Sequence, residues 1–287
     1  MQTFRHKCQK TQNNDRTDDM ENDKDLPNLK FYKNVMRFRP DGVYIEDFHK
    51  SWFGDYGRLE YVHSYIQWLF PIQEKGMNFD SRELSLKEIK LFRMDEEVKK
   101  KLLTSYKLML DFYGIELVSE ETGEVQRAVN WRERFANLNR NTHNNLRITR
   151  ILKCLGLLGF RHYQAPLVHF FLEETLVKDT LPRVKHSVLD YFLFAVLDKS
   201  ERKDLIRFAF RNFEPQEKFV WCPRRIQRKL RKGISQQKYP SQTPARARRE
   251  VMHHEPADRS LRGVLPRYQN SAWNSRARQV KQNCTLV

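Results

Sequence analysis

The stretch that decides the fold is "GRLEYVHSYIQWLF", residues 57–70. One set of apolar residues recurs at helical spacing, at i, i+3, i+7 and i+10: Leu59, Val62, Ile66 and Leu69. A second set lies on another face of the same helix: Tyr61, Tyr65 and Trp68. A helix that is apolar on two sides is normally buried among other helices. The stretch therefore predicts a core helix of a bundle, ending near Phe70 because Pro71 disfavours helical geometry in the residue before it.

The sequence that follows predicts two further helices and one hairpin. "SLKE", residues 85–88, is a capping box, in which Ser85 and Glu88 satisfy free backbone N–H groups. A helical face runs from 98 to 113 and ends at Gly114, a suitable C-cap. "IELVSEETGEVQRA", residues 115–128, predicts a β-hairpin that turns at Thr122-Gly123.

The second half of the central block predicts helices alone. Asn130 and Ser200 are expected to cap two of them, and Gly159 is expected to end another. Pro166 and Pro182 suit the first turns of two more. The segment 183–198 is expected to face inward with four apolar residues: Val184, Val188, Phe192 and Ala195. The fold class is therefore all-α, a single domain of about seven helices with one small hairpin.

Composition divides the chain into three parts. Residues 1–27 are polar and are expected to be disordered, whereas residues 28–221 carry apolar and aromatic side chains throughout and form the predicted domain. Residues 222–287 are rich in Gln, Ser and Pro and are predicted to be a disordered basic tail. This tail holds about 16 Lys and Arg against 3 Asp and Glu, about +13 of the formal net charge of +17.

Cysteine spacing and hydropathy indicate the compartment. Cys8, Cys154, Cys222 and Cys284 are far apart and form no CxxC pair, which predicts neither a zinc site nor a disulfide framework. A reducing intracellular compartment fits this usage. No apolar run approaches the roughly 20 residues of a membrane span, and residues 1–25 lack the apolar stretch of a signal peptide.

Motifs for catalysis and cofactors are missing. The sequence contains no GxGxxG, GxxxxGK[ST], GxSxG or HExxH pattern. Glu173 and Glu174 are adjacent and point apart on a helix, so we expect a solvated face. His49 and His63 are expected to be partly buried and satisfied rather than catalytic. The chain is predicted to have no catalytic residues, no metal site and no cofactor.

Two basic features could meet phosphates. His143, Arg147 and Arg150 form a stripe at i, i+4 and i+7, for which a hydrated outer face is the favoured interpretation. The run "RRIQRKLRK", residues 224–232, is denser. Its cations predict a signal for a nuclear import carrier: Arg224, Arg225, Arg228, Lys229, Arg231 and Lys232. Binding of nucleic acid without sequence preference is the alternative.

Several long runs of the central block resemble one known family. They include "RFRPDGVYIEDFHKSWFGDYGRLEYVHSYIQWLFPIQEKGMNF", "TGEVQRAVNWRERFANLNRNTHNNLRITRILK" and "YQAPLVHFFLEETLVKDTLP". With "NLKFYKN", "YKLMLDFYGIELV" and "FVWCP", they are similar to the conserved N-terminal region of the opioid growth factor receptor family. The similarity spans about residues 28–223.

The resemblance implies a function and a ligand. It implies a receptor for the pentapeptide Met-enkephalin that restrains cell proliferation, located in the nucleus and perinuclear cytoplasm, with peripheral membrane association. The alternative function is a non-catalytic nuclear scaffold or a module that associates with nucleic acid.

Such a peptide needs aromatic anchors and a carboxylate for its terminal amine. Aromatic and acidic residues between 52 and 68 are therefore predicted to line its groove: Trp52, Phe53, Asp55, Tyr56, Tyr65 and Trp68. Helical spacing favours a core position instead for Tyr65 and Trp68.

Overall fold

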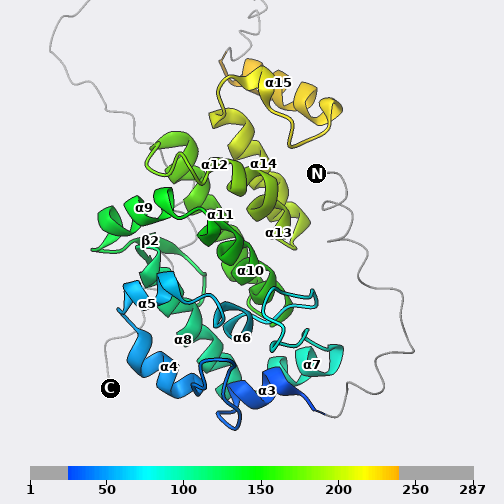
Figure 1. Ribbon diagram of the computed structural model, residues 1–287. Coiled ribbons are helices and arrows are strands. Elements are labelled where there is room, and N and C mark those ends of the chain that lie inside the picture. The colour runs from blue at the N-terminus through cyan, green and yellow to red at the C-terminus, as the bar shows by residue number, and fades with distance from the viewer. Residues whose placement is uncertain (1–24, 239–287) are drawn as a thin grey trace, which may run out of the picture. The chain divides into compact units, whose positions relative to one another are not determined.

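The computed structural model describes residues 25–238, with side chains described up to Arg231 (Figure 1). The described part is helical apart from one two-stranded antiparallel sheet. The predicted all-α class with one small hairpin is confirmed. The predictions for residues 1–24 and 239–287 lie outside the described residues.

The first half of the domain is built around a long helix, α8 (Glu96–Phe112). It contacts α3 (Pro27–Tyr32), α4 (Ile45–Trp52) and α7 (Leu86–Met94). Both bonds of the capping box predicted for α7 are present. The buried carboxylate of Glu88 also accepts hydrogen bonds from the backbone N–H and the side-chain amide of Asn28, at 2.9 and 3.0 Å. A local cap thus also fastens α3 to α7.

The predicted helix at 57–70 is interrupted. It consists of α5 (Tyr56–Tyr61) and α6 (Ile66–Leu69), and the chain is extended at Val62, with φ −81° and ψ 133°. The prediction of one continuous helix was therefore wrong. The interruption turns Tyr61 outward, where it is 83% exposed, while Tyr65 and Trp68 remain in the core. Its cause is a tertiary contact from Arg147, which donates to the Val62 carbonyl.

The hairpin joins α8 to the second half of the domain. Strand β1 (Ile115–Leu117) pairs with β2 (Val125–Arg127), so that Glu116 lies opposite Gln126. Gly123 in the turn has φ +75°, and a Cβ there would lie 2.7 Å from the carbonyl oxygen of His162. The predicted turn is confirmed, and Gly114, with φ +76°, ends α8 directly after the C-cap residue Tyr113.

The second half packs around α10 (His143–Leu157) and α11 (Gln164–Leu172). Between the hairpin and α10 lies α9 (Trp131–Arg140), and η1 (Arg161–Tyr163) links α10 to α11. A π-helical segment, η2 (Glu173–Val177), continues α11. Asn130 makes no cap bond to α9, contrary to the prediction; its Nδ2 donates to the Tyr56 hydroxyl and to Asp111, and its Oδ1 accepts no hydrogen bond from the described residues.

The last helices close the domain. The segment 183–198 contains α12 (Lys185–Ser187), the π-helical η3 (Val188–Phe192) and α13 (Leu193–Ala195). Its four predicted inward residues are all buried. Helix α14 (Lys199–Asn212) is capped by Asp198, which accepts from two backbone N–H groups, and not by Ser200 as predicted. Breaks and π segments divide the domain into more and shorter pieces than the about seven helices predicted.

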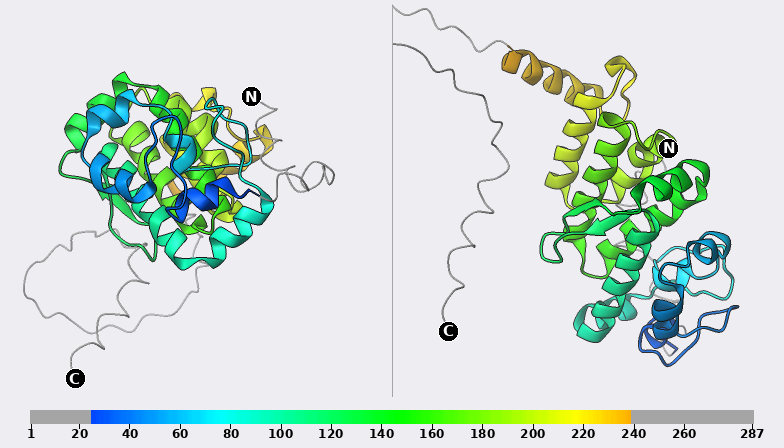
Figure 2. Two further views of the ribbon diagram at one scale, coloured as in Figure 1. Left: turned by 60° about the horizontal axis from the view of Figure 1, so that its bottom comes forward. Right: turned by 90° about the vertical axis from the view of Figure 1, so that its left-hand side faces the viewer.

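The chain continues through η4 (Gln216–Lys218) into α15 (Arg224–Lys238). The sequence predicts disorder from residue 222, so α15 corrects that prediction. Arg, Lys, Gln and Leu are good helix formers, and the Pro223 carbonyl accepts from the N–H groups of Ile226 and Gln227. Figure 2 shows α15 at the end of the domain opposite α3 and α4.

One continuous hydrophobic cluster runs through the domain from Leu29 to Cys222. It includes edge-on aromatic pairs at both ends, such as Phe31 with Trp68 and Phe213 with Trp221. Such pairs contribute about 0.5–1.5 kcal/mol beyond the area they bury. The two halves therefore share one core.

Candidate functional site

Three residues of the predicted peptide groove lie in the core. Trp52 and Tyr65 have no exposed surface and Trp68 is 2% exposed. Trp52 packs against Phe48 with ring centroids 4.5 Å apart, and Tyr65 packs against the same ring at 5.3 Å. These three rings cannot line a groove, which corrects the prediction, because the interior of the domain requires them for packing.

The other three predicted residues are accessible at the start of α5. Phe53 is 59% exposed, Asp55 is exposed and Tyr56 is half-buried. Asp55 is the N-cap of α5, where its carboxylate accepts from the backbone N–H of Arg58 at 3.0 Å. The Arg58 guanidinium lies 4.1 Å from the ring centroid of Trp52 and covers it. This edge presents one aromatic ring and one carboxylate to solvent.

A polar cluster lies directly behind this edge. The Tyr56 hydroxyl donates to Asp111 Oδ2 at 2.8 Å and accepts from the amide of Asn130 at 2.7 Å. Arg134 donates through Nε to the Phe112 carbonyl, and its guanidinium lies 4.4 Å from the centroid of Tyr56. Burial and the bond to Asp111 raise the pKa of Tyr56. The phenol therefore stays protonated and fixes the start of α5 against α8 and α9.

A second polar cluster holds the other end of α5. The Glu60 carboxylate accepts from the amides of Asn137, at 2.5 Å, and Asn144, at 3.1 Å. His143 Nε2 lies 2.6 Å from Glu60 Oε1, and the rings of His63 and His143 are 5.0 Å apart. Burial and the nearby Arg147 lower the pKa of His143. The cluster gathers a carboxylate, two imidazoles and two amides at a partly open edge.

Arg147 organises this second cluster. Its Nη1 donates to the Leu59 carbonyl at 2.9 Å and to the Tyr65 hydroxyl at 3.2 Å, and its Nη2 donates to the Val62 carbonyl at 3.0 Å. Arg147 is only 5% exposed. The guanidinium thus satisfies carbonyls that a continuous helix would have used itself, which explains the break between α5 and α6.

The basic stripe is accordingly not a hydrated outer face. Arg147 is buried, and Arg150 is half-buried and donates through Nε to the Phe70 carbonyl at 2.8 Å. Burial lowers the pKa of Arg150 to about 10. The prediction was wrong because the carbonyls at the ends of α5 and α6, formed by a distant part of the sequence, require donors.

The paired glutamates also differ from the prediction. Glu174 is fully buried and receives two bonds from Arg127, at 3.0 and 2.5 Å. Lys178 and the Thr180 hydroxyl donate to the same carboxylate, at 2.9 and 2.6 Å. Only Glu173 remains partly exposed. This ion pair joins β2 to η2 and is structural.

His49 is partly buried and satisfied, as predicted. Its Nε2 lies 2.8 Å from the Ser105 hydroxyl, which joins α4 to α8. Burial and the nearby Lys101 lower the pKa of His49 to about 4.

This shift predicts acid sensitivity. The unfolded chain takes up a proton on this histidine near its ordinary pKa of about 6.5, whereas the folded chain resists protonation down to about 4. Stability is therefore full above pH 6.5 and falls as the pH drops toward 4. Between pH 7.5 and 4.5, the free energy of unfolding of His49→Gln is expected to fall by about 2 kcal/mol less than that of the unaltered chain. Urea unfolding between pH 4.5 and 7.5 measures it, and parallel curves for both proteins would contradict the assignment.

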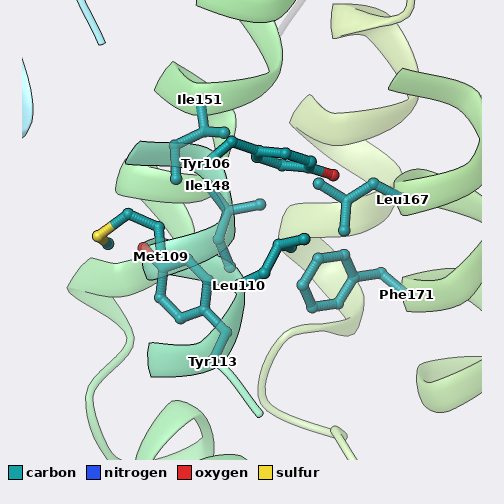
Figure 3. Close-up of a pocket in the computed structure, with 8 residues that line it drawn as sticks. All are labelled: Tyr106, Met109, Leu110, Tyr113, Ile148, Ile151, Leu167 and Phe171. Carbon is teal, nitrogen blue, oxygen red and sulfur yellow. The ribbon is translucent and has the colours of Figure 1, made fainter. Parts of the chain in front are cut away.

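A small cavity lies where α8, α10 and α11 meet (Figure 3). It is lined by eight residues: Tyr106, Met109, Leu110, Tyr113, Ile148, Ile151, Leu167 and Phe171. Its volume of about 10 Å³ is close to the minimum for one water molecule. It cannot hold a peptide. The hydroxyls of Tyr106 and Tyr113 are buried and have no hydrogen-bond partner among the described residues.

Removing one of these hydroxyls should therefore cost little. Tyr106→Phe is expected to leave the free energy of unfolding unchanged or raise it by up to about 1 kcal/mol, because an unpaired hydroxyl is no longer buried. Tyr65→Phe is the matched control, since the Tyr65 hydroxyl donates to the Leu59 carbonyl at 2.8 Å. The control should lose about 1–2 kcal/mol. Equal losses in urea unfolding would show that Tyr106 is paired.

The described residues offer no clear centre for catalysis or metal binding. Among them, no group of three or more His, Cys, Asp or Glu side chains is arranged to hold a metal ion. No helix within 25–238 is long and apolar enough to cross a membrane. The polar clusters are instead used to fix helices to one another.

Comparison with known proteins decides the family. Residues 21–228 match the family model described as "Opioid growth factor receptor (OGFr) conserved region". The chain belongs to the opioid growth factor receptor family. An opioid growth factor receptor of Mus musculus is 54% identical over 207 residues, which are 72% of this chain and 33% of that protein. No solved structure matches the chain significantly.

A second branch of the opioid growth factor receptor family is similar to the same degree. An opioid growth factor receptor-like protein 1 of Rattus norvegicus is 52% identical over 199 residues, 69% of this chain and 43% of that protein. The corresponding protein of Xenopus tropicalis is 49% identical over 205 residues, 71% of this chain and 40% of that protein. The chain thus spans less than half the length of these relatives.

The matched region contains both polar clusters, for which the sequence predicted Asn130 and Arg147 in other roles and did not indicate Arg134, Asn137 or Asn144. A signal for them exists in "NWRERFANLNRNTHNN", residues 130–145. Asn130, Arg134, Asn137, Asn141 and Asn144 recur there every three or four residues, as core positions do. Polar residues at the spacing of core positions indicate a buried polar interface.

Proposed function

We propose that this chain is a receptor for the pentapeptide Met-enkephalin that acts in the nucleus and perinuclear cytoplasm to restrain proliferation. The observation that carries the proposal is family membership. The chain is 54% identical to an opioid growth factor receptor over 207 residues, and the family model matches residues 21–228, which include the hydrophobic core. A ligand-binding role is also compatible with the described polar clusters, because their side chains hold helices in place.

The chemistry of the peptide limits where it can bind. Tyr-Gly-Gly-Phe-Met carries an amine at one end and two aromatic rings, and it loses conformational freedom when it is ordered. The cavity between α8, α10 and α11 is too small for it. A surface site is therefore required. The edge of α5 offers Phe53 for a ring and Asp55 for the amine, beside the half-buried Tyr56.

Calorimetric titration of the full chain with Met-enkephalin tests this site. Phe53→Ala and Asp55→Asn are expected to weaken binding about tenfold each, because each removes one anchor. Phe79→Ala is the matched control, since Phe79 is 84% exposed and lies in the loop after α6. Absence of any binding by the unaltered chain would refute the receptor function. Binding that only Phe79→Ala weakens would refute the α5 site alone.

Nuclear location rests on the basic run at 224–232. Import carriers bind such runs as extended peptides, whereas this run begins α15. Import through it therefore requires local unwinding of α15. Replacing Arg224, Arg225, Arg228 and Lys229 by Gln should move a fluorescently tagged chain toward the cytoplasm. Unchanged nuclear accumulation would refute the import signal.

The alternative function is a non-catalytic nuclear scaffold or a module that associates with nucleic acid. Helix α15 favours it, because part of the basic tail forms a helix and the five cations described in that helix, from Arg224 to Arg231, are exposed. Peptide titration and nucleic-acid binding distinguish the two functions, since they involve α5 and α15, which lie in separate parts of the described domain (Figure 1).

A further inference from the structure

Helix α15 is fixed to the domain by one side of its first turns. The Gln227 amide donates to the carbonyls of Phe219 and Cys222, both at 2.9 Å. Leu230 is half-buried and packs against the hydrophobic core. Helix α14 also contacts α15. These contacts hold the helix in one orientation on the surface of the domain.

The opposite side of these turns is strongly basic. Arg224, Arg225, Arg228 and Lys229 are all exposed. At about 100° per residue they fall within an arc of about 140°. No ion pair involves these four side chains among the described residues, and residues 224–238 contain no Asp or Glu. Nothing in α15 itself neutralises this basic face, defined here as these four residues.

We propose that the basic face of α15 binds the phosphate backbone of duplex DNA, with the helix lying in the major groove. The major groove of B-form DNA is about 12 Å wide and admits an α-helix. A helix of 15 residues is about 22 Å long and passes the phosphates on both sides of the groove. Exposed Arg and Lys side chains neutralise these phosphates and release their counterions.

Other polyanions fit the helix less well. Helices that lie in membranes present a broad apolar face with Trp, Phe or Leu. Residues 224–238 contain no aromatic residue, and Leu230 already packs on the core. The major groove of A-form RNA is too narrow for a helix. Duplex DNA is therefore the ligand that suits both the shape and the charge of α15.

The contacts are expected to be independent of base sequence. The Gln227 amide, which could form paired hydrogen bonds with adenine, is engaged by two backbone carbonyls. Phosphate contacts position a protein without reading sequence. This inference deepens the alternative function and does not depend on peptide binding.

Fluorescence anisotropy of the full chain with a labelled duplex of mixed sequence tests the proposal. Four phosphate contacts contribute about −4 to the slope of log affinity against log salt concentration. The double variant Arg225→Gln/Arg228→Gln should weaken binding about ten- to hundredfold and make the slope shallower by about 2. Gln keeps a similar helix propensity, and circular dichroism confirms the fold.

Two matched pairs show whether the basic face is responsible. Lys203→Gln/Arg211→Gln removes the same charge from exposed positions of α14. Arg248→Gln/Arg249→Gln removes it from the tail beyond the described residues. Both pairs should change the affinity less than threefold. An equal loss for all three pairs would overturn the proposal in favour of net charge alone, and so would unchanged binding by Arg225→Gln/Arg228→Gln.

A variant that keeps every charge tests the helical form. Gln227→Pro and Gln227→Ala both lose the amide bonds to Phe219 and Cys222, but only Gln227→Pro disrupts α15, so it should bind DNA at least about tenfold more weakly than Gln227→Ala. Equal affinity of both variants would overturn the major-groove mode. Binding to phosphatidylserine vesicles without binding to DNA would assign the helix to membranes instead. Failure of these tests leaves the peptide titration unaffected.

Discussion

Arg147→Met is expected to lower the free energy of unfolding by about 3–5 kcal/mol. The substitution leaves the carbonyl of Val62 without the donor that Arg147 Nη2 supplies at 3.0 Å. It also removes donors from the Leu59 carbonyl and from the amide oxygen of Asn144. Each buried polar group that loses its partner costs about 1–3 kcal/mol. Urea unfolding of the purified chain measures the loss.

The control for this prediction lies on the neighbouring helix. Arg140→Met removes the same charge from an exposed position at the end of α9, and exposed charges contribute about 0–1 kcal/mol. Arg147→Lys keeps the charge but not the planar guanidinium that reaches several carbonyls. Its free energy of unfolding should therefore fall by about half as much as that of Arg147→Met. Losses under 1 kcal/mol for Arg147→Met would show that the break between α5 and α6 does not depend on this guanidinium.

Glu174→Gln is expected to lower the free energy of unfolding by about 2–4 kcal/mol. The amide cannot accept the paired bonds from Arg127 and keep those from Lys178 and Thr180. The partly exposed cations Arg127 and Lys178 then lose the fully buried carboxylate that they share. Glu173→Gln is the adjacent control, and its carboxylate is 38% exposed. Similar small losses for both positions would contradict a special role for Glu174.

The same carboxylate predicts a response to acid. Burial raises the pKa of Glu174, but the hydrogen bonds from Arg127, Thr180 and Lys178 outweigh burial and bring the pKa below 4.5. The unfolded chain therefore takes up the proton first as the pH falls. Glu174 stabilises the fold fully above pH 4.5, and its contribution is lost as the pH drops through the folded pKa. In Glu174→Gln the dependence of stability on pH below 4.5 should be shallower than in the unaltered chain.

Local signals predicted the elements whose causes are local. The capping box of Ser85 and Glu88 and the turn at Gly123 depend on side chains and φ angles within a few residues. The buried positions of Tyr65 and Trp68 followed from helical periodicity. The sequence did not show which residues of the predicted peptide site are exposed, because Trp52 and Phe53 are adjacent aromatic residues of similar apolar character.

The sequence by itself determined an all-α domain with one hairpin, its family and the basic character of the tail. Only the tertiary structure decided which polar side chains enter the core and where helices break. Arg147 lies 88 residues from the Leu59 carbonyl that it satisfies, and Glu174 lies 47 residues from Arg127. Periodicity indicates whether a position faces inward, but the free energy of a buried charge depends on partners that distant segments supply.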